Sequence, residues 1–336
     1  YFAVHGANLD SIMHKLGVYN YRLKNPNFIH EREINVNLTL DEQAAARDFF
    51  LCVANQFERN EDESMLPTMK IGDHDITRLI AGSNPFTGKS HMTPEVDADM
   101  KAYFTDEQAF AMLRRCEEAG INAVQSRGSQ PIMGLLGRYR AAGGNLLWLA
   151  TSGKSLTTFD EELDAMMAYN PAAVCIHGEL ADELYMAGML DRLEGLLDKI
   201  RRKNVPCGIC AHFPEVLAWA EEQNLRPDYY MASVYNLSQP DRSHDVNPTG
   251  ERFEDSDIPK MYAVIRELSA PTIALKILGA GRRCADQAQV KAVFTEAFAS
   301  IKRGDGVLVG MFDKYCDQPR LNAEYALEAI RQVEGI

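Results

Sequence analysis

The sequence predicts an α/β protein of the (β/α)8 barrel class, the TIM barrel, and two observations predict it. From Met69 onward, eight short apolar runs alternate with eight amphipathic helical patterns, and the 336 residues are enough for one such barrel with an additional segment. Alternating strands and helices favour parallel pairing, and eight units favour closure. An open doubly wound sheet is the alternative, although no Gly-x-Gly-x-x-Gly motif follows the first run.

Residues 1–66 are predicted to be an N-terminal extension, and residues 67–336 the barrel. The extension is polar, with one helical pattern at Leu40–Glu58 and a charged linker after it. Its apolar helix face, around Phe49 and Phe57, is expected to pack on the barrel or to form a homo-oligomer contact. Because the chain begins with Tyr1, we expect a cytoplasmic protein or an exported one whose signal has been removed.

The elements of the barrel follow one another regularly. A hairpin turning at Gly72-Asp73 is expected first. The predicted strands are Arg78–Ala81, Ile121–Gln125, Leu146–Thr151, Ala172–His177, Pro206–His212, Tyr229–Tyr235, Pro271–Leu278 and Gly306–Gly310. The predicted helices lie near Asp106–Ala119, Pro131–Ala142, Glu161–Tyr169, Leu190–Lys203, Pro214–Gln223, Asp257–Leu268, Gln287–Lys302 and Leu321–Val333. The strands are almost entirely apolar, as expected where helices cover the sheet.

Composition and charge exclude several classes of protein. The hydrophobic fraction of 46% is typical of a globular chain, and no apolar stretch approaches the ~18 residues of a membrane span. The 35 basic and 48 acidic residues give a net charge of −13, so nucleic acid and anionic membrane are not expected as partners. Seven irregularly spaced cysteines favour buried thiols over a disulfide framework, and Cys207 and Cys210 are interpreted as packing residues.

Polar residues gather where the predicted strands end, which is where barrel enzymes carry their chemistry. We therefore expect an enzyme with a small-molecule substrate. The alternative is a catalytically silent barrel that binds a ligand. The expected substrate-binding residues are Asn84, Gln125, Arg127, Tyr235 and Asn236. The Tyr235 ring is expected to stack on a flat cofactor or a sugar face, and the polar loop 241–253, which contains His244, is a candidate lid.

Several segments resemble the aldo/keto reductase family. They are Leu66–Ser83, Glu117–Val124, Val174–His177, and Gly310 with Arg320–Asn322, and the resemblance extends from Leu66 to Ile336. It implies a barrel, an oxidoreductase and an NADP-type cofactor. The chain departs from the family's catalytic Asp–Tyr–Lys–His set, because Gln125 replaces the Asp, no Tyr follows it, and Thr151 and Ser152 stand where the Lys belongs. Only His177 matches, so classical carbonyl reduction is not expected.

Four residues are the expected catalytic set: His177, Glu179, His212 and Lys276. His177 and His212 end neighbouring strands, so their side chains should approach one another. Together with Glu179 they either handle protons or, as the alternative, hold Zn²⁺ or another divalent ion with an open position for water. A further reading is that both histidines only form hydrogen bonds to substrate or loop backbone.

Lys276 interrupts an apolar run on the seventh strand. If it points into the barrel, loss of solvation lowers its pKa and makes it a base or a Schiff-base nucleophile. The alternative is an ion pair with a carboxylate such as Glu179, which would keep the lysine charged.

A cofactor or phosphate site is expected in the loops after the seventh and eighth strands. Gly279 and Gly281 would offer backbone N–H groups, while Arg282 and Lys314 would add positive charge. An ordinary helix N-terminus with solvated arginines is the alternative. The sequence thus predicts a barrel enzyme acting on a sugar-like or oxo/hydroxy compound, with a metal-dependent isomerase or lyase as the second reading.

Overall fold

The computed structural model describes residues 65–242 and 251–336. The chain divides into two units, Tyr1–Met65 and Leu66–Ile336. The second unit carries the fold described below. The predicted helix at Leu40–Glu58 and His244 of the loop after the sixth strand lie outside the described residues.

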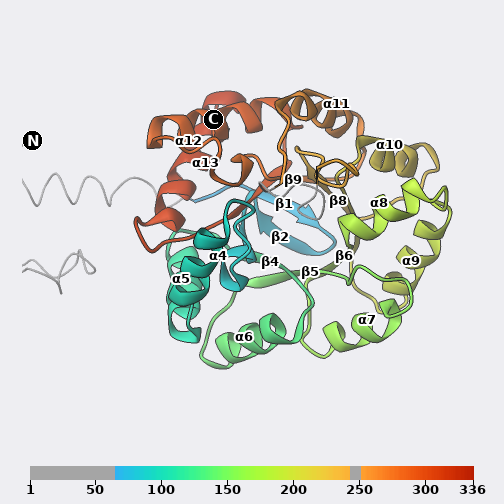
Figure 1. Cartoon of the computed structure of the whole chain (residues 1–336), viewed down its shortest axis with the longest axis horizontal. Helices are drawn as coiled ribbons and strands as arrows, with labels where there is room; N and C mark the ends of the chain where they lie inside the picture. The colour runs from blue at the N-terminus through green and yellow to red at the C-terminus, as the bar shows by residue number, and fades with distance from the viewer. Residues whose placement is uncertain (1–64, 243–250) are drawn as a thin grey trace, which may run out of the picture. The chain divides into compact units, whose positions relative to one another are not determined.

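Eight parallel strands close into a barrel, in the order β10-β3-β4-β5-β6-β7-β8-β9 (Figure 1). The strands are β3 (Leu79–Gly82), β4 (Ala123–Arg127), β5 (Leu147–Thr151), β6 (Ala173–Ile176), β7 (Cys207–Ala211), β8 (Tyr229–Ser233), β9 (Thr272–Leu275) and β10 (Gly306–Gly310). The first and last strands pair directly, with Val307 opposite Leu79. The predicted fold class is therefore confirmed, and the open sheet is excluded.

Helices surround the barrel. They are α4 (Pro94–Tyr103), α5 (Asp106–Glu118), α6 (Gln130–Ala141), α7 (Phe159–Met167), α8 (Gly178–Met186), α9 (Arg192–Arg201), α10 (Pro214–Glu222), α11 (Ile258–Glu267), α12 (Gln287–Ser300) and α13 (Gln318–Glu334). Among the described residues, three short 3-10 helices lie in the loops, at Asn84–Thr87, Asp255–Asp257 and Gly279–Gly281. Two of the α-helices are absent from the sequence prediction: α4, which lies between β3 and α5, and α8, which begins two residues after the end of β6.

Alternate residues of each strand belong to two different hydrophobic clusters. Ile80, Leu149 and Met231 belong to the inner cluster, while their chain neighbours Leu79, Trp148 and Tyr230 belong to the larger outer cluster beneath the helices. This is the period of two that strand geometry imposes. Each strand therefore presents one set of residues to the interior and the other to the helix layer.

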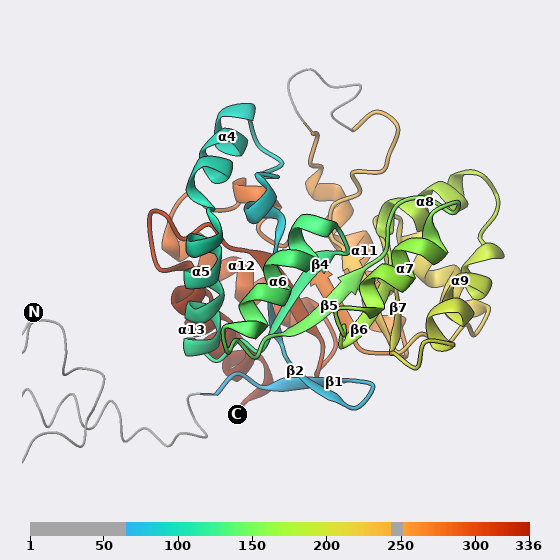
Figure 2. The ribbon, with the colours of Figure 1, turned by 90° about the horizontal axis from the view of Figure 1, so that it is seen from below.

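A hairpin closes one end of the barrel (Figure 2). Strands β1 (Thr68–Ile71) and β2 (His74–Thr77) pair antiparallel across the predicted Gly72-Asp73 turn. Gly72 has φ of 56°, and a Cβ on it would lie 2.4 Å from the Pro206 ring, so the turn requires glycine. Met69, Ile71 and Ile76 join the inner cluster. The opposite end, where the strands terminate, is left for the functional site.

The described cysteines agree with the thiol prediction. All six are free, and four of them, Cys116, Cys175, Cys207 and Cys210, are buried. Cys207 lies in the outer cluster and Cys210 in the inner one, so their side chains occupy different layers. Burial raises the pKa of Cys210 to about 12, which makes it a packing residue. Within the described residues, no helix is long and apolar enough to cross a membrane.

Candidate functional site at the carboxyl ends of the strands

His212 directly follows β7, and its side chain is held by a buried carboxylate. Its Nδ1 lies 2.7 Å from Asp182 Oδ2 on α8, and the backbone N–H groups of His212 and Phe213 donate to Asp182 Oδ1 at 3.1 and 3.2 Å. Asp182 is completely buried. Because a carboxylate only accepts hydrogen bonds, this arrangement assigns the ring proton to Nδ1 and leaves Nε2 as an acceptor.

Ser238, in the loop after β8, completes the surroundings of Asp182. Its hydroxyl donates to Asp182 Oδ2 at 2.6 Å and lies 3.2 Å from His212 Nδ1. Asn236 Oδ1 in turn accepts from the Ser238 N–H at 3.2 Å. The carboxylate thus accepts from three further N–H and O–H donors besides the imidazole, which fixes its position and that of the ring.

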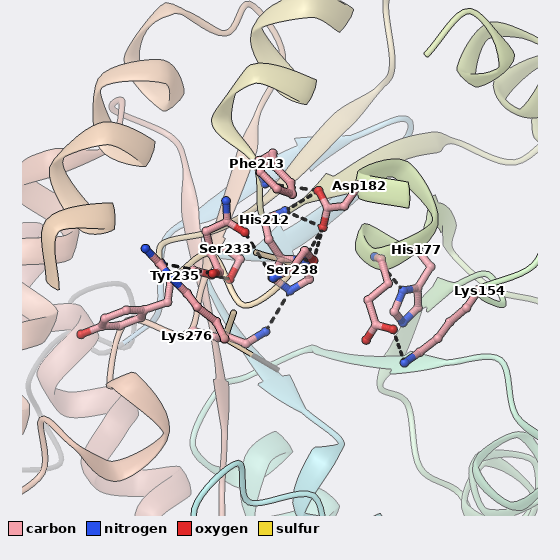
Figure 3. Close-up of polar contacts among 12 residues, drawn as sticks. Lys154, His177, Asp182, His212, Phe213, Ser233, Tyr235, Ser238 and Lys276 are labelled. Atoms are coloured by element: carbon pink, nitrogen blue, oxygen red, sulfur yellow. Dashed lines mark hydrogen bonds and ion pairs between the residues drawn. The ribbon is translucent and has the colours of Figure 1, made fainter. Parts of the chain in front are cut away.

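Lys276 reaches His212 from β9, with Nζ 3.3 Å from His212 Nε2 (Figure 3). The backbone explains this direction. Leu275 already packs on the inner cluster, so strict alternation would turn Lys276 outward toward the helices. Lys276 instead has φ of 64°, the left-handed region that a non-glycine residue rarely adopts, and its side chain returns to the barrel mouth. Burial lowers the pKa of Lys276 below its ordinary value.

A cavity of about 410 Å³ opens beside Lys276, at the ends of β3, β9 and β10. Of the residues predicted to form the site, four line it: Asn84, Gln125, Lys276 and Gly281. Much of the remaining wall is apolar and includes Met92, Val96, Leu278, Val290, Leu308 and Phe312. This combination of an apolar chamber with a few polar groups is typical of small-molecule sites.

His177 belongs to a second polar group on the other side of His212 (Figure 3). Its Nδ1 accepts the backbone N–H of Glu179 at 3.1 Å and thereby caps α8. Burial lowers the pKa of His177 to about 3, so the ring stays neutral. Burial acts to raise the pKa of Glu179, but the paired Lys154 ammonium holds it below its usual value. Gly178, the residue after His177, lies beside the His212 ring, because a Cβ added to it would be 3.1 Å from His212 Cε1.

The alternative metal site is not assembled. Nε2 of His212 faces the Lys276 ammonium, Nδ1 of His177 is used in capping, and Glu179 pairs with Lys154 rather than with Lys276. No group of three His, Cys, Asp or Glu side chains in the described part of the chain is placed to hold a metal ion. Nε2 of His212, Nδ1 of His177 and the Glu179 carboxylate thus have other partners, so these contacts do not favour the metal reading.

The loop after β9, which was expected to bind a phosphate, uses its backbone N–H groups in hydrogen bonds of its own. The N–H groups of Gly279, Gly281 and Arg282 donate to carbonyl groups within 276–279, at 2.8, 3.1 and 3.2 Å. The Arg282 guanidinium stacks on Phe253 at 4.0 Å and donates to the carbonyl groups of His91, Gly279 and Glu251. An NADP pyrophosphate would have to displace these bonds.

Lys314 does not join that loop either. It pairs with Asp99 of α4 and contacts Tyr315, and it is not among the residues that line the cavity. The predicted cofactor residues Gly279, Gly281, Arg282 and Lys314 therefore do not form one binding site. The residues present do not fit the nicotinamide cofactor that the family resemblance implies.

Two predicted substrate-binding residues have structural contacts instead. Tyr235 is buried; its hydroxyl donates to Asp255 at 3.0 Å, and its ring points away from His212 (Figure 3). Asn236 is buried in the loop that holds Ser238. Gln125 lines the cavity and donates to Thr151 Oγ1 at 2.5 Å, while Arg127 is exposed, 4.0 Å from Glu162. The strand ends at Ser233, so Tyr235 lies past it and belongs to the outer hydrophobic cluster.

Sequence reasoning missed Asp182 and Ser238. Asp182 carries a usable signal, because it stands beside Leu180, Ala181 and Leu184 in a helix that presses on the barrel. A carboxylate on a buried helix face requires a partner, and the histidine after the next strand is the nearest candidate in barrel topology. Ser238 carries no comparable signal, since its contact depends on the path of an irregular loop.

Neither a scan against models of known protein families nor a search of curated proteins finds a match to this chain. Similar solved structures include a truncated 3-deoxy-D-arabino-heptulosonate 7-phosphate synthase from Thermotoga maritima, 14% identical with a TM-score of 0.47 over 82% of this chain and 93% of that one. They also include an aldo-keto reductase from Bacillus halodurans, 9% identical with a TM-score of 0.49 over 80% and 96%. Neither likeness bears on activity, and the fold assignment stands on the strand order itself.

Proposed function

We propose that this chain is an enzyme that transfers protons at carbon next to a carbonyl group of a small oxo or hydroxy compound. Lys276 and His212 would be the catalytic residues, and Asp182 would position His212. The reaction class is that of isomerases and lyases that form an enol-type intermediate.

One observation carries this proposal: Lys276 Nζ, His212 Nε2 and the buried Asp182 carboxylate form a continuous chain of contacts beside the cavity. A base positioned by a third group is the usual arrangement for moving a proton. Burial lowers the pKa of Lys276 toward the range in which an amine exchanges protons. When protonated, the same lysine would stabilise negative charge that develops on a carbonyl oxygen.

The proposal departs from the chemistry of the aldo/keto reductases. The family's proton-donating tyrosine is missing from the segment after β4, and Gln125 donates to Thr151 where the family has a carboxylate and a lysine. The loop after β9 is closed by its own hydrogen bonds. These observations favour proton transfer over hydride transfer in this barrel.

Solvent deuterium exchange tests the proposal without knowledge of the natural substrate. The full chain would be incubated in D₂O with small aldehydes, ketones and hydroxyketones, and proton NMR would follow loss of the C–H signals next to the carbonyl. We expect exchange above the uncatalysed rate with at least one class of compound. Absence of catalysed exchange across sugars, keto acids and apolar ketones would contradict the proposal.

Two variants tie the exchange to the site. His212→Asn keeps a side-chain donor for Asp182 but removes the atom that faces Lys276, so exchange should fall by roughly 10²–10⁴-fold. Lys291→Met is the matched control, since Lys291 lies on α12 in an exposed pair with Glu328. If His212→Asn exchanges protons as fast as the unchanged chain does, the residues assigned here are wrong.

A further inference from the structure

We infer that Lys276 is a nucleophile, which forms a covalent imine with the carbonyl carbon of an aldehyde or ketone. This inference deepens the proposed function, on which it rests for the substrate class. The Lys276 nitrogen would then form a bond to the substrate's carbonyl carbon in addition to transferring protons.

The geometry matches that of an activated nucleophile. The nucleophilic atom and its base are in contact, Nζ to Nε2 at 3.3 Å, and the base is oriented by a buried carboxylate at 2.7 Å from its other nitrogen. In hydrolases the same order of nucleophile, histidine and aspartate activates a serine. Here the amine takes the place of the hydroxyl, and a lysine amine attacks carbonyl carbon to form an imine.

The backbone is specialised for this placement. Lys276 adopts φ of 64°, and Gly279, Ala280 and Gly281 follow with φ of 57°, 51° and 88°. Non-glycine residues rarely adopt this region, and such outliers concentrate at functional sites. In an ordinary strand conformation, the Lys276 side chain would point into the helix layer, away from His212 and the cavity.

The chamber beside Lys276 suits imine formation. Leu278, Leu308 and Phe312 are among the apolar residues of its wall, and Lys276 is itself partly buried. Desolvation disfavours the ammonium form and favours loss of water from the adduct. The wall also suggests that the carbonyl compound carries an apolar substituent of a size that the 410 Å³ cavity can hold.

The steps balance without any co-reactant. The Lys276 ammonium gives a proton to His212 Nε2, and the amine lone pair forms the N–C bond as the carbonyl π pair moves onto oxygen. His212 delivers its proton to that oxygen and then takes one from the nitrogen. His212 then gives this second proton to the hydroxyl oxygen of the adduct. The C–O bond breaks, water leaves, and the protonated imine remains. The net reaction joins one ammonium and one carbonyl and releases one water.

Reductive trapping tests the inference on the full chain. The protein would be incubated at neutral pH with sodium cyanoborohydride and either cyclohexanone or dihydroxyacetone, and peptide mass spectrometry would quantify the reduced adduct at each lysine. We expect Lys276 to be labelled about tenfold or more above exposed lysines such as Lys70 and Lys291, with cyclohexanone the better probe. Labelling of Lys276 at or below the level of those lysines would overturn the inference.

The comparison with deuterium exchange separates the two proposals. Catalysed exchange without selective labelling would overturn the imine and leave the proposed proton transfer standing. Selective labelling without exchange would support the imine and contradict the proposed function. His212→Asn should lower labelling of Lys276 while labelling of Lys291 stays unchanged. Equal labelling of Lys276 in both proteins would remove His212 from the mechanism.

Discussion

Three side chains meet at the barrel mouth through two contacts. They are Asp182 from α8, His212 after β7 and Lys276 after β9. The sequence alone predicts that Lys276 is unusual, because a charged residue inside an apolar strand has to find a partner. It names the wrong partner, Glu179, since the left-handed backbone at Lys276 cannot be inferred from residue types. It misses Asp182 because the helix that carries it was not predicted.

Asp182→Asn should damage both activity and stability. The amide nitrogen of asparagine donates hydrogen bonds, so at least one of the four donors around this position would face another donor. We expect exchange to fall by roughly 10²–10⁴-fold and the free energy of unfolding by about 1–3 kcal/mol. Urea unfolding and the D₂O assay measure the two effects. Ser238→Ala removes one of those donors and should cause a smaller loss of each; an equal loss would contradict this account.

Lys276→Met should stabilise the protein at neutral pH, and the gain should shrink as the pH rises. The pKa of Lys276 is lowered in the folded state from 10.5, so the unfolded chain binds more protons between the two values. Stability of the unchanged protein therefore increases with pH through this window. Below the folded pKa, the partly buried ammonium carries a desolvation cost, which the methionine lacks. Thermal unfolding of both proteins from pH 6 to pH 10 measures the difference, and a constant or growing difference would contradict the burial argument.

Helix α8 links the two polar groups of the mouth. It begins at Gly178, is capped by His177 and presents Asp182 to His212. The eight strands could be predicted because short apolar runs alternate with amphipathic helical patterns at regular spacing along the chain. Helix α8 could not be predicted, because its nine residues follow a strand almost directly, with no turn signal between them.

Gly178→Ala should reduce activity more than stability. A Cβ at this position would lie 3.1 Å from His212 Cε1 and Cys210 Sγ, so the imidazole would have to shift. A displaced base would lower the exchange rate by about tenfold or more. Gly195→Ala on the exposed face of α9 is the matched control, because nothing lies within 4 Å of its Cβ. That change should leave exchange intact and stabilise the helix by about 0.5–1 kcal/mol. Equal exchange in both variants would show that Gly178 does not position His212.

Closure of the barrel depends on contacts at the end opposite the site. Arg78, just before β3, donates to Glu334 at the end of α13 at 2.6 Å and to the backbone of Asp305 before β10 at 2.6 Å. These bonds join the first and last strands to the C-terminal helix. The barrel was predictable from the repeat of strands and helices. The cavity could not be predicted, because its wall combines strand ends with helix α4, which the sequence does not predict, and with loops whose paths depend on particular side chains.

Glu334→Ala should destabilise the whole barrel without changing the chemistry. Arg78 and Glu334 are only 3% and 9% exposed, and removal of the carboxylate leaves a buried guanidinium without its partner. The free energy of unfolding should fall by up to about 3–5 kcal/mol. Glu328→Ala breaks an exposed pair on the same helix and should cost less than about 1 kcal/mol. Chemical denaturation compares the two variants, and similar losses in both would show that the Arg78 pair does not secure closure.

Nitrogen NMR of the His212 ring, with ¹⁵N-labelled histidine and His212→Asn for assignment, tests the contact between His212 and Lys276 most directly. The structure predicts a proton on Nδ1, facing Asp182, and an unprotonated Nε2 whose signal changes when Lys276 is replaced by methionine. A proton on Nε2, or a signal indifferent to that replacement, would show that the two side chains do not form one catalytic unit.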